Sequence, residues 1–92
     1  MTHSPKLLEQ LSMQVEETKT IVGIGAEYVH FKNPNRRYEV VFVGVLESTN
    51  EICVVYKPMF RGGLIWVRTL EDFTSKAKLE DGTEIDRFTK VG

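Results

Sequence analysis

The first segment of the chain has the hydrophobic pattern of an amphipathic helix. Leu8, Leu11 and Val15 recur at spacings of three and four residues with polar side chains between them, and this spacing places them on one side of a helix. Ser4 is a typical N-cap residue, and the proline after it is tolerated in the first turn. We therefore predict a helix over residues 5–18.

From about residue 26 the pattern changes to the alternation that is typical of strands. The expected strands are Glu27–Lys32, Arg37–Leu46, Glu51–Lys57, Leu64–Arg68, Ser75–Leu79 and Glu84–Thr89. Turn-forming residues separate them at 33–36, 48–50, 61–63 and 81–82, and Thr69 is suited to cap one helical turn. One helix and five or six short, closely spaced strands favour a mainly β fold, a small antiparallel barrel or roll.

The composition fits one small domain. The chain has 92 residues, of which 41% are hydrophobic and 27% charged, and this excludes disordered and low-complexity classes. Its single cysteine, Cys53, excludes an internal disulfide framework and agrees with a reducing compartment. The longest apolar run, Val40–Leu46, is too short to span a membrane as a helix, and the N-terminus lacks the pattern of a secretory signal. We expect a cytoplasmic protein.

The distribution of charge is uneven although the formal net charge is only -1. Residues 32–68 contain six basic and three acidic side chains, whereas the segments on either side are acidic. A local basic face in this middle segment is therefore compatible with an anionic partner. The near-neutral total argues against a dedicated nucleic-acid binder.

Several short motifs occur in a definite order after residue 25. They are Tyr28-Val29-His30-Phe31-Lys32, Tyr38-Glu39-Val40, Val54-Val55-Tyr56, Trp66-Val67-Arg68, Phe73, the Asp81-Gly82 turn and Arg87-Phe88. In order and spacing these motifs resemble the bacterial domain-of-unknown-function family 1653. The resemblance implies a small SH3-like β-barrel, and it implies no catalysed reaction.

The resemblance divides the chain into two parts. Residues 1–24 form the predicted helix and its connector, and residues 25–92 form the SH3-like barrel domain. The sequence departs from the family pattern at three places: Asn33 replaces a common glycine, Thr69 a usual proline, and the histidine usual before the third strand is missing near Leu46. If the family uses that histidine for binding or chemistry, this protein has lost it.

Strand alternation suggests a binding face. Tyr28 and His30 share one side of their strand, and we expect Val29 and Phe31 to take the core side. In the same way Trp66 and Arg68 lie opposite Ile65 and Val67, which we expect in the core. The candidate binding residues are Tyr28, His30, Lys32, Tyr56, Trp66, Arg68 and Arg87. Aromatic rings beside cations suit a peptide strand, a single-stranded nucleic acid or a cationic group.

Structural roles are the alternative for the same residues. A lone tryptophan such as Trp66 is common in a core or at its rim, and His30 fits a hydrogen-bonded structural histidine. The two arginines fit ion pairs that order the sheet. Their candidate partners are Glu39, Glu71 and Asp86.

Catalytic and metal-binding signals are weak, and we assign no catalytic residue, metal ligand or cofactor. One cysteine and two histidines, of which His3 is in the N-terminal tail, do not make a Cys/His zinc site. Neither Gly23-x-Gly25 nor Gly62-Gly63 has the remaining residues of a phosphate-binding loop. Cys53 lies between apolar neighbours and fits a buried small side chain better than a nucleophile.

The favoured function is a non-enzymatic interaction module that binds a protein or peptide. The alternatives are a nucleic-acid-binding module that uses residues 32–68, and a small-ligand or enzymatic protein centred on His30. The apolar side of the helix needs a cover. Either its own barrel or a second copy of the chain supplies it, so the protein is a monomer or a helix-mediated homodimer.

Overall fold

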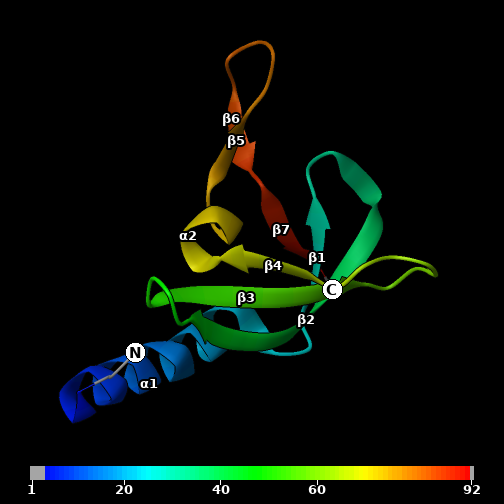
Figure 1. Cartoon of the computed structure of the whole chain (residues 1–92). Coiled ribbons are helices and arrows are strands. Elements are labelled where there is room, and N and C mark those ends of the chain that lie inside the picture. The colour runs from blue at the N-terminus through cyan, green and yellow to red at the C-terminus, as the bar shows by residue number, and fades with distance from the viewer. Residues whose placement is uncertain (1–3, 92) are drawn as a thin grey trace.

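A curled antiparallel sheet with a long helix along one side forms the body of the molecule (Figure 1). The computed structural model describes residues 4–91, so His3 and the other terminal residues lie outside the described part. Helix α1 (Pro5–Thr18) has the predicted bounds, and the Ser4 Oγ accepts a hydrogen bond from the N–H of Leu7 at 3.1 Å. A π-helical turn, η1 (Lys19–Gly23), continues it and ends at Gly23, whose φ is 77°.

Strands make up most of the remaining chain. They are β1 (Glu27–His30), β2 (Asn33–Leu46), β3 (Glu51–Pro58), β4 (Trp66–Thr69), β5 (Lys76–Lys78), β6 (Glu84–Asp86) and β7 (Phe88–Val91). The short helix α2 (Leu70–Phe73) follows β4, and Thr69 Oγ1 caps it by accepting from the N–H of Asp72 at 3.1 Å. The prediction of a mainly β fold with an N-terminal helix is confirmed.

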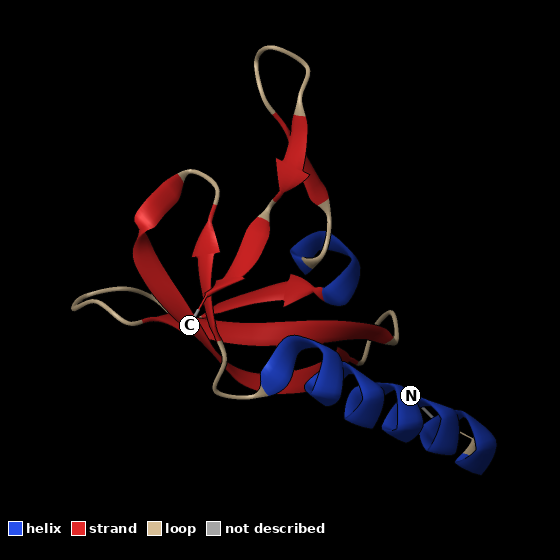
Figure 2. Ribbon diagram, turned by 180° about the vertical axis from the view of Figure 1, so that it is seen from behind, coloured by secondary structure: helices blue, strands red, loops and turns tan. Residues whose placement is uncertain are grey.

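The sheet does not close into a barrel, so of the expected barrel or roll the structure shows the open form. Its five strands follow the order β4-β3-β2-β1-β7, and β5 pairs only with β6 in a separate hairpin. The predicted last strand is split at Arg87, whose N–H donates to the carbonyl of Ser75 while its own carbonyl accepts from Phe31. After this split the chain pairs with β1 as strand β7. Strands β4 and β7 are therefore the two free edges of an open roll (Figure 2).

The predicted turn at residues 33–36 is also wrong. The chain reverses at Phe31 and Lys32, and β2 already begins at Asn33. Val29 pairs with Arg37 but His30 pairs with Asn33, so the residues between these two partners bulge out of the ladder. A bulge accommodates a proline, which has no N–H to donate, and this explains why residue 34 is tolerated within a strand.

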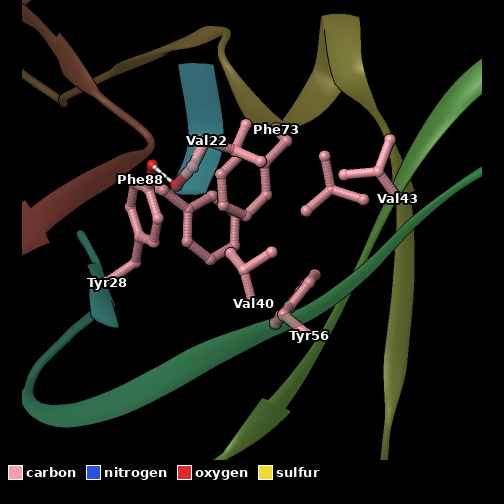
Figure 3. Packing of buried hydrophobic residues seen from close by; sticks show 8 residues of the cluster. Val22, Tyr28, Val40, Val43, Tyr56, Phe73 and Phe88 are labelled. Carbon is pink, nitrogen blue, oxygen red and sulfur yellow. Dashed lines mark hydrogen bonds between the residues drawn. The ribbon is translucent and has the colours of Figure 1, made fainter. Parts of the chain in front are cut away.

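The core lies on the concave side of the roll (Figure 3). It consists of Val22, Tyr28, Val40, Val43, Val54, Tyr56, Phe73 and Phe88. The rings of Phe73 and Phe88 stack with their centroids 4.4 Å apart. The hydroxyl of buried Tyr28 donates to the carbonyl of Val22 at 2.7 Å, which satisfies its polar end inside the core.

Helix α1 lies along β2 and β3 of its own chain, the first of the two covers expected for its apolar side. Leu11 is buried and Val15 packs against the core, whereas Leu8 is 49% exposed. The connector contributes Val22 to the core, so the helix and the sheet are joined through a buried residue. Among residues 4–91, no helix combines the length and the apolar character that crossing a membrane requires.

Candidate functional site

A cavity of about 360 Å³ opens between the two edges of the roll, where the core reaches the surface. Five strands, β1, β2, β3, β4 and β7, supply its aromatic and cationic walls. The cavity is lined by His30, Asn33, Tyr38, Tyr56, Trp66, Val67, Arg68 and Phe88. We call it the aromatic–basic cavity.

The register of the strands explains why these side chains meet. Tyr56 is the partner of Trp66, and Arg68 is the partner of Val54, so Tyr56, Trp66 and Arg68 project from the concave face of the sheet. Tyr38 comes from the next strand, with its ring 5.7 Å from that of Tyr56. Since alternate residues of a strand share a face, one surface carries both the core and the cavity.

Arg68 is fixed by two hydrogen bonds. Its Nε donates to the hydroxyl of Tyr56 at 2.9 Å, and its Nη1 donates to Asp72 Oδ2 at 2.7 Å. The guanidinium also lies 5.2 Å from the centre of the Phe88 ring, within the range of a cation–π contact. Partial burial acts to lower the pKa of Arg68, but the bonds to Tyr56 and Asp72 outweigh it and the pKa is raised.

His30 stands against the same wall, edge-on to Phe88 with the ring centres 4.9 Å apart. Its Nδ1 accepts a hydrogen bond from the backbone N–H of Lys32 at 3.2 Å, so a neutral ring carries its proton on Nε2. Burial lowers the pKa of His30, and nearby cations lower it further, against an opposing effect of Asp72. The cations are Arg68, Arg87 and Lys32.

The polar groups of the cavity are therefore mainly hydrogen-bond donors. Within residues 4–91, the Nη2 of Arg68, the Nε2 of His30 and the indole N–H of Trp66 have no hydrogen-bond partner. Trp66 is 48% exposed, so its ring and its N–H are accessible to a ligand. A group with acceptor oxygens and an apolar or aromatic body matches these walls.

Comparison with known proteins places the chain in a family. The family model described as "Protein of unknown function (DUF1653)" matches residues 26–90. The chain belongs to this family. Among solved structures it is similar to the crystal structure of a DUF1653 protein from Bordetella bronchiseptica, with 27% sequence identity and a TM-score of 0.61. That match covers 74% of this chain and 86% of the other. No curated protein matches this chain.

The limits of the DUF1653 match separate the cavity from the N-terminal helix. All of the residues that line the aromatic–basic cavity lie between 26 and 90. Helix α1 lies outside this range. The cavity is therefore built from the part of the chain that the family model describes.

Three of the candidate binding residues lie outside this cavity. Tyr28 is 8% exposed and belongs to the core, so the assignment of its face to a surface patch is wrong. Lys32 is exposed beside Phe31, with its Nζ 5.8 Å from the ring centre. The Nε of Arg87 donates to the Ser75 Oγ at 2.9 Å. The charges of these two cations nevertheless act on His30.

The expected core side of β4 is also wrong. Ile65 and Val67 are 66% and 61% exposed, because β4 is an edge strand and the core covers its opposite face. In β1, Val29 is only partly buried. The alternation predicts correctly which residues of each strand share a face. Which of the two faces lies inside depends on how the sheet curls, and the periodicity of one strand does not determine this.

The sequence reasoning missed two aromatic walls of the site and one ion-pair partner. Tyr38 and Phe88 had an available signal, since both belong to the family motifs. Asp72 pairs with Arg68 at 2.7 Å and lies 3.9 Å from Arg87, in place of the acids that the structural alternative named. Asp72 lies in α2, which follows β4 directly, so the end of the strand and the start of the helix bring the two side chains together.

A second cavity of about 370 Å³ lies between α1 and the β2–β3 hairpin. Its walls are aliphatic and acidic. It is lined by Leu8, Leu11, Ser12, Val15, Glu16, Val45, Glu47 and Asn50, and we call it the helix-side cavity. Asn50 has a φ of 63°, and its Oδ1 is buried with no hydrogen-bond partner among the described residues.

The enzymatic alternative centred on His30 would need a nucleophilic side chain beside the imidazole, and the described residues of the cavity supply none. The hydrogen bond of its ring goes to a backbone N–H, and the cavity walls within residues 4–91 include no serine, threonine or cysteine. Cys53 is buried, and burial raises the pKa of its thiol, with the charge of Glu51 acting in the same direction. The described residues contain no cluster of three or more side chains suited to hold a metal ion.

Proposed function

We propose that this chain is a non-enzymatic interaction module that recognises a segment of a protein or peptide in its aromatic–basic cavity. The observation that carries the proposal is the convergence of Tyr56, Trp66, Arg68 and His30 on one concave site with unengaged donors. Tryptophan, tyrosine and arginine are the side chains that contribute most to protein–protein binding. Rings held by a rigid sheet lose little conformational entropy on binding.

The proposal is tested by selecting peptides from a random displayed library against the whole chain. The enriched peptides are then measured by calorimetry with three proteins: wild type, Trp66→Ala and Phe42→Ala. Phe42 is a matched control because it is an aromatic residue, 69% exposed, on the convex face of the sheet. We expect Trp66→Ala to weaken binding about 100-fold and Phe42→Ala to leave it within about twofold. A library that yields no binding peptide, or equal losses in both variants, contradicts the proposal.

One observation favours the nucleic-acid alternative. The guanidinium of Arg36 stacks 4.6 Å from the centre of the Phe60 ring, and Phe60 in turn contacts Tyr38 of the cavity. An exposed arginine on an aromatic ring is a platform for an unpaired base. This alternative requires retention of single-stranded DNA or RNA at about 50 mM salt and a steep loss of binding as the salt concentration rises.

Two finer expectations belong to the same proposal. We take the open roll as SH3-like, supported by its antiparallel order β4-β3-β2-β1-β7 and the single helical turn after β4; an experimental structure with a different strand order would contradict this. We also assign the module to the cytoplasm, supported by the buried free thiol of Cys53, which a reducing compartment preserves. Cell fractionation tests the compartment.

A further inference from the structure

The two edges of the five-stranded sheet carry different side chains. Edge strand β7 presents Thr89 and Lys90 to solvent, and polar or charged residues of this kind discourage another strand from pairing. Edge strand β4 is the reverse. Trp66 and Val67 are 48% and 61% exposed, and Leu64 just before them is 65% exposed. One edge is thus protected and the other is apolar and open.

The backbone of β4 is available on its outer side. The strand pairs with β3 on one side only, and within residues 4–91 no other strand is hydrogen-bonded to it. The chain approaches this strand through Gly63, which packs so closely on the ring of Pro58 that any side chain there would clash with it. The segment before the edge therefore passes close to the end of β3, and the unpaired backbone groups of β4 are a template for one more strand.

A strand added at this edge would meet two different surfaces. On the convex face, Val67 continues a row of cross-strand partners that runs through Val55 to Phe42. On the concave face, Trp66 and Arg68 border the aromatic–basic cavity. Because side chains alternate along a strand, a ligand residue opposite Val67 lies on the convex face and its two neighbours point into the cavity.

The charge around the cavity favours some ligand side chains over others at the two positions that point into it. Arg68, Arg87 and Lys32 all act on His30 as cations, and among residues 4–91 Asp72 is the carboxylate that opposes them. The Nη2 of Arg68 has no hydrogen-bond partner among the described residues. A carboxylate opposite Arg68 would gain a charge-assisted hydrogen bond there, whereas a cationic side chain would be repelled.

We infer that an extended, acidic peptide binds by adding a strand to the open edge of β4. The peptide places an apolar residue over Val67, an aromatic residue beside Trp66 and a carboxylate on Arg68. This inference rests on the proposed function, since it names the partner and the geometry for the same cavity.

The test uses two short end-blocked peptides with the central sequence glutamate–valine–tyrosine or its reverse, which cover antiparallel and parallel addition. Binding is measured by calorimetry, and amide hydrogen exchange of residues 64–69 is measured with and without peptide. We expect one direction to bind, with slowed exchange in this segment, and methylation of alternate peptide nitrogens to weaken binding tenfold or more. Replacing the peptide glutamate by glutamine should weaken binding about tenfold in wild type and less than twofold in Arg68→Gln.

A charge on the edge is the complementary test. Val67→Glu should weaken binding tenfold or more, because it removes the apolar contact and repels an acidic peptide, whereas Phe42→Glu, on the same convex face two strands away, should leave it within twofold. If neither peptide binds, or if binding is indifferent to methylation and to Val67→Glu, strand addition is overturned, while peptides from the library that depend on Trp66 would still support the proposed function. A dimer of the chain that Val67→Glu dissociates would overturn the inference in favour of a second copy at this edge.

Discussion

The two cavities of this molecule have almost the same volume and opposite chemistry. The aromatic–basic cavity has about 360 Å³ and walls of aromatic rings and cations, and the helix-side cavity has about 370 Å³ and walls of aliphatic and acidic side chains. The first is an extension of the core and lies within the DUF1653 match, whereas the second exists only because α1 packs on the sheet. Volume therefore does not distinguish them.

The two cavities differ in how their charged side chains are held. In the aromatic–basic cavity, Arg68 is held by Tyr56 and Asp72 and still has donors to offer. Beside the helix-side cavity, Glu16 of α1 pairs with Lys19 of η1 in an exposed ion pair, and such pairs contribute little to stability. In the proposed function, Arg68 is the rigid group that a ligand engages, whereas the exposed pair of Glu16 and Lys19 belongs to a solvated surface.

The largest expected difference between the cavities is in stability. Phe88 is 7% exposed and shared by the core and the aromatic–basic cavity, while Leu11 is 9% exposed and faces the helix-side cavity. We expect Phe88→Ala to lower the free energy of unfolding by about 4 kcal/mol and Leu11→Ala by about 2 kcal/mol. Urea denaturation measures both. A larger loss for Leu11→Ala would mean that the helix side is the more tightly packed region.

A smaller difference is expected between the ion pairs of the two regions. Arg68→Met keeps the length of the side chain but removes its bonds to Tyr56 and Asp72, and we expect a loss of about 1.5 kcal/mol. Lys19→Met removes the exposed pair with Glu16, and we expect a loss of about 0.3 kcal/mol. Both are measured by the same denaturation. Equal effects would show that Arg68 is no better fixed than a surface lysine.

The smallest expected effect is a pH dependence that only the aromatic–basic cavity has, because the helix-side cavity contains no histidine. The pKa of His30 is lowered in the folded protein, first by burial and then by the surrounding cations. As the pH falls below about 6.5, the unfolded chain takes up this proton before the folded one does, so stability decreases. Above that pH the ring is neutral in both states and contributes no pH dependence.

The variant His30→Gln isolates this effect. Its stability should vary less than that of wild type between pH 7 and pH 5, as measured by thermal unfolding across that range. The loss of ring packing on Phe88 shifts the stability of the variant at every pH, so the comparison uses the slope with pH and not the absolute stability. Identical pH profiles for the two proteins would contradict a lowered pKa of His30 in the folded protein.

Local signals in the sequence predicted most of the elements. Ser4 and Thr69 both cap the helices that their neighbours predict, because an N-cap depends only on residues within one turn. The split at Arg87 was missed because it depends on hydrogen bonds to Ser75 and Phe31, which are far away in the chain. The missing closure of the sheet follows from the same long-range contacts.

The candidate site was predicted in part, for a similar reason. The alternation of β1 and β4 placed His30, Trp66 and Arg68 on common faces of their strands, and these three residues do line one cavity. The curl of the sheet buries the side chain of Tyr28 in the core and leaves that of Val67 exposed to solvent. A strand pattern fixes which residues share a face, and the packing of the other strands decides which face is inside.

The central claim is that recognition takes place in the aromatic–basic cavity, and the single tryptophan of the chain allows a direct test. Trp66 lines that cavity and is 48% exposed, so a ligand that covers it changes its fluorescence. We predict that peptides selected against the whole chain produce a saturable shift of the emission to shorter wavelength, at the concentrations where calorimetry detects binding. We predict the same shift in Leu8→Gln, which alters the helix-side cavity. Binding that leaves the emission of Trp66 unchanged, or that Leu8→Gln abolishes, would contradict the account.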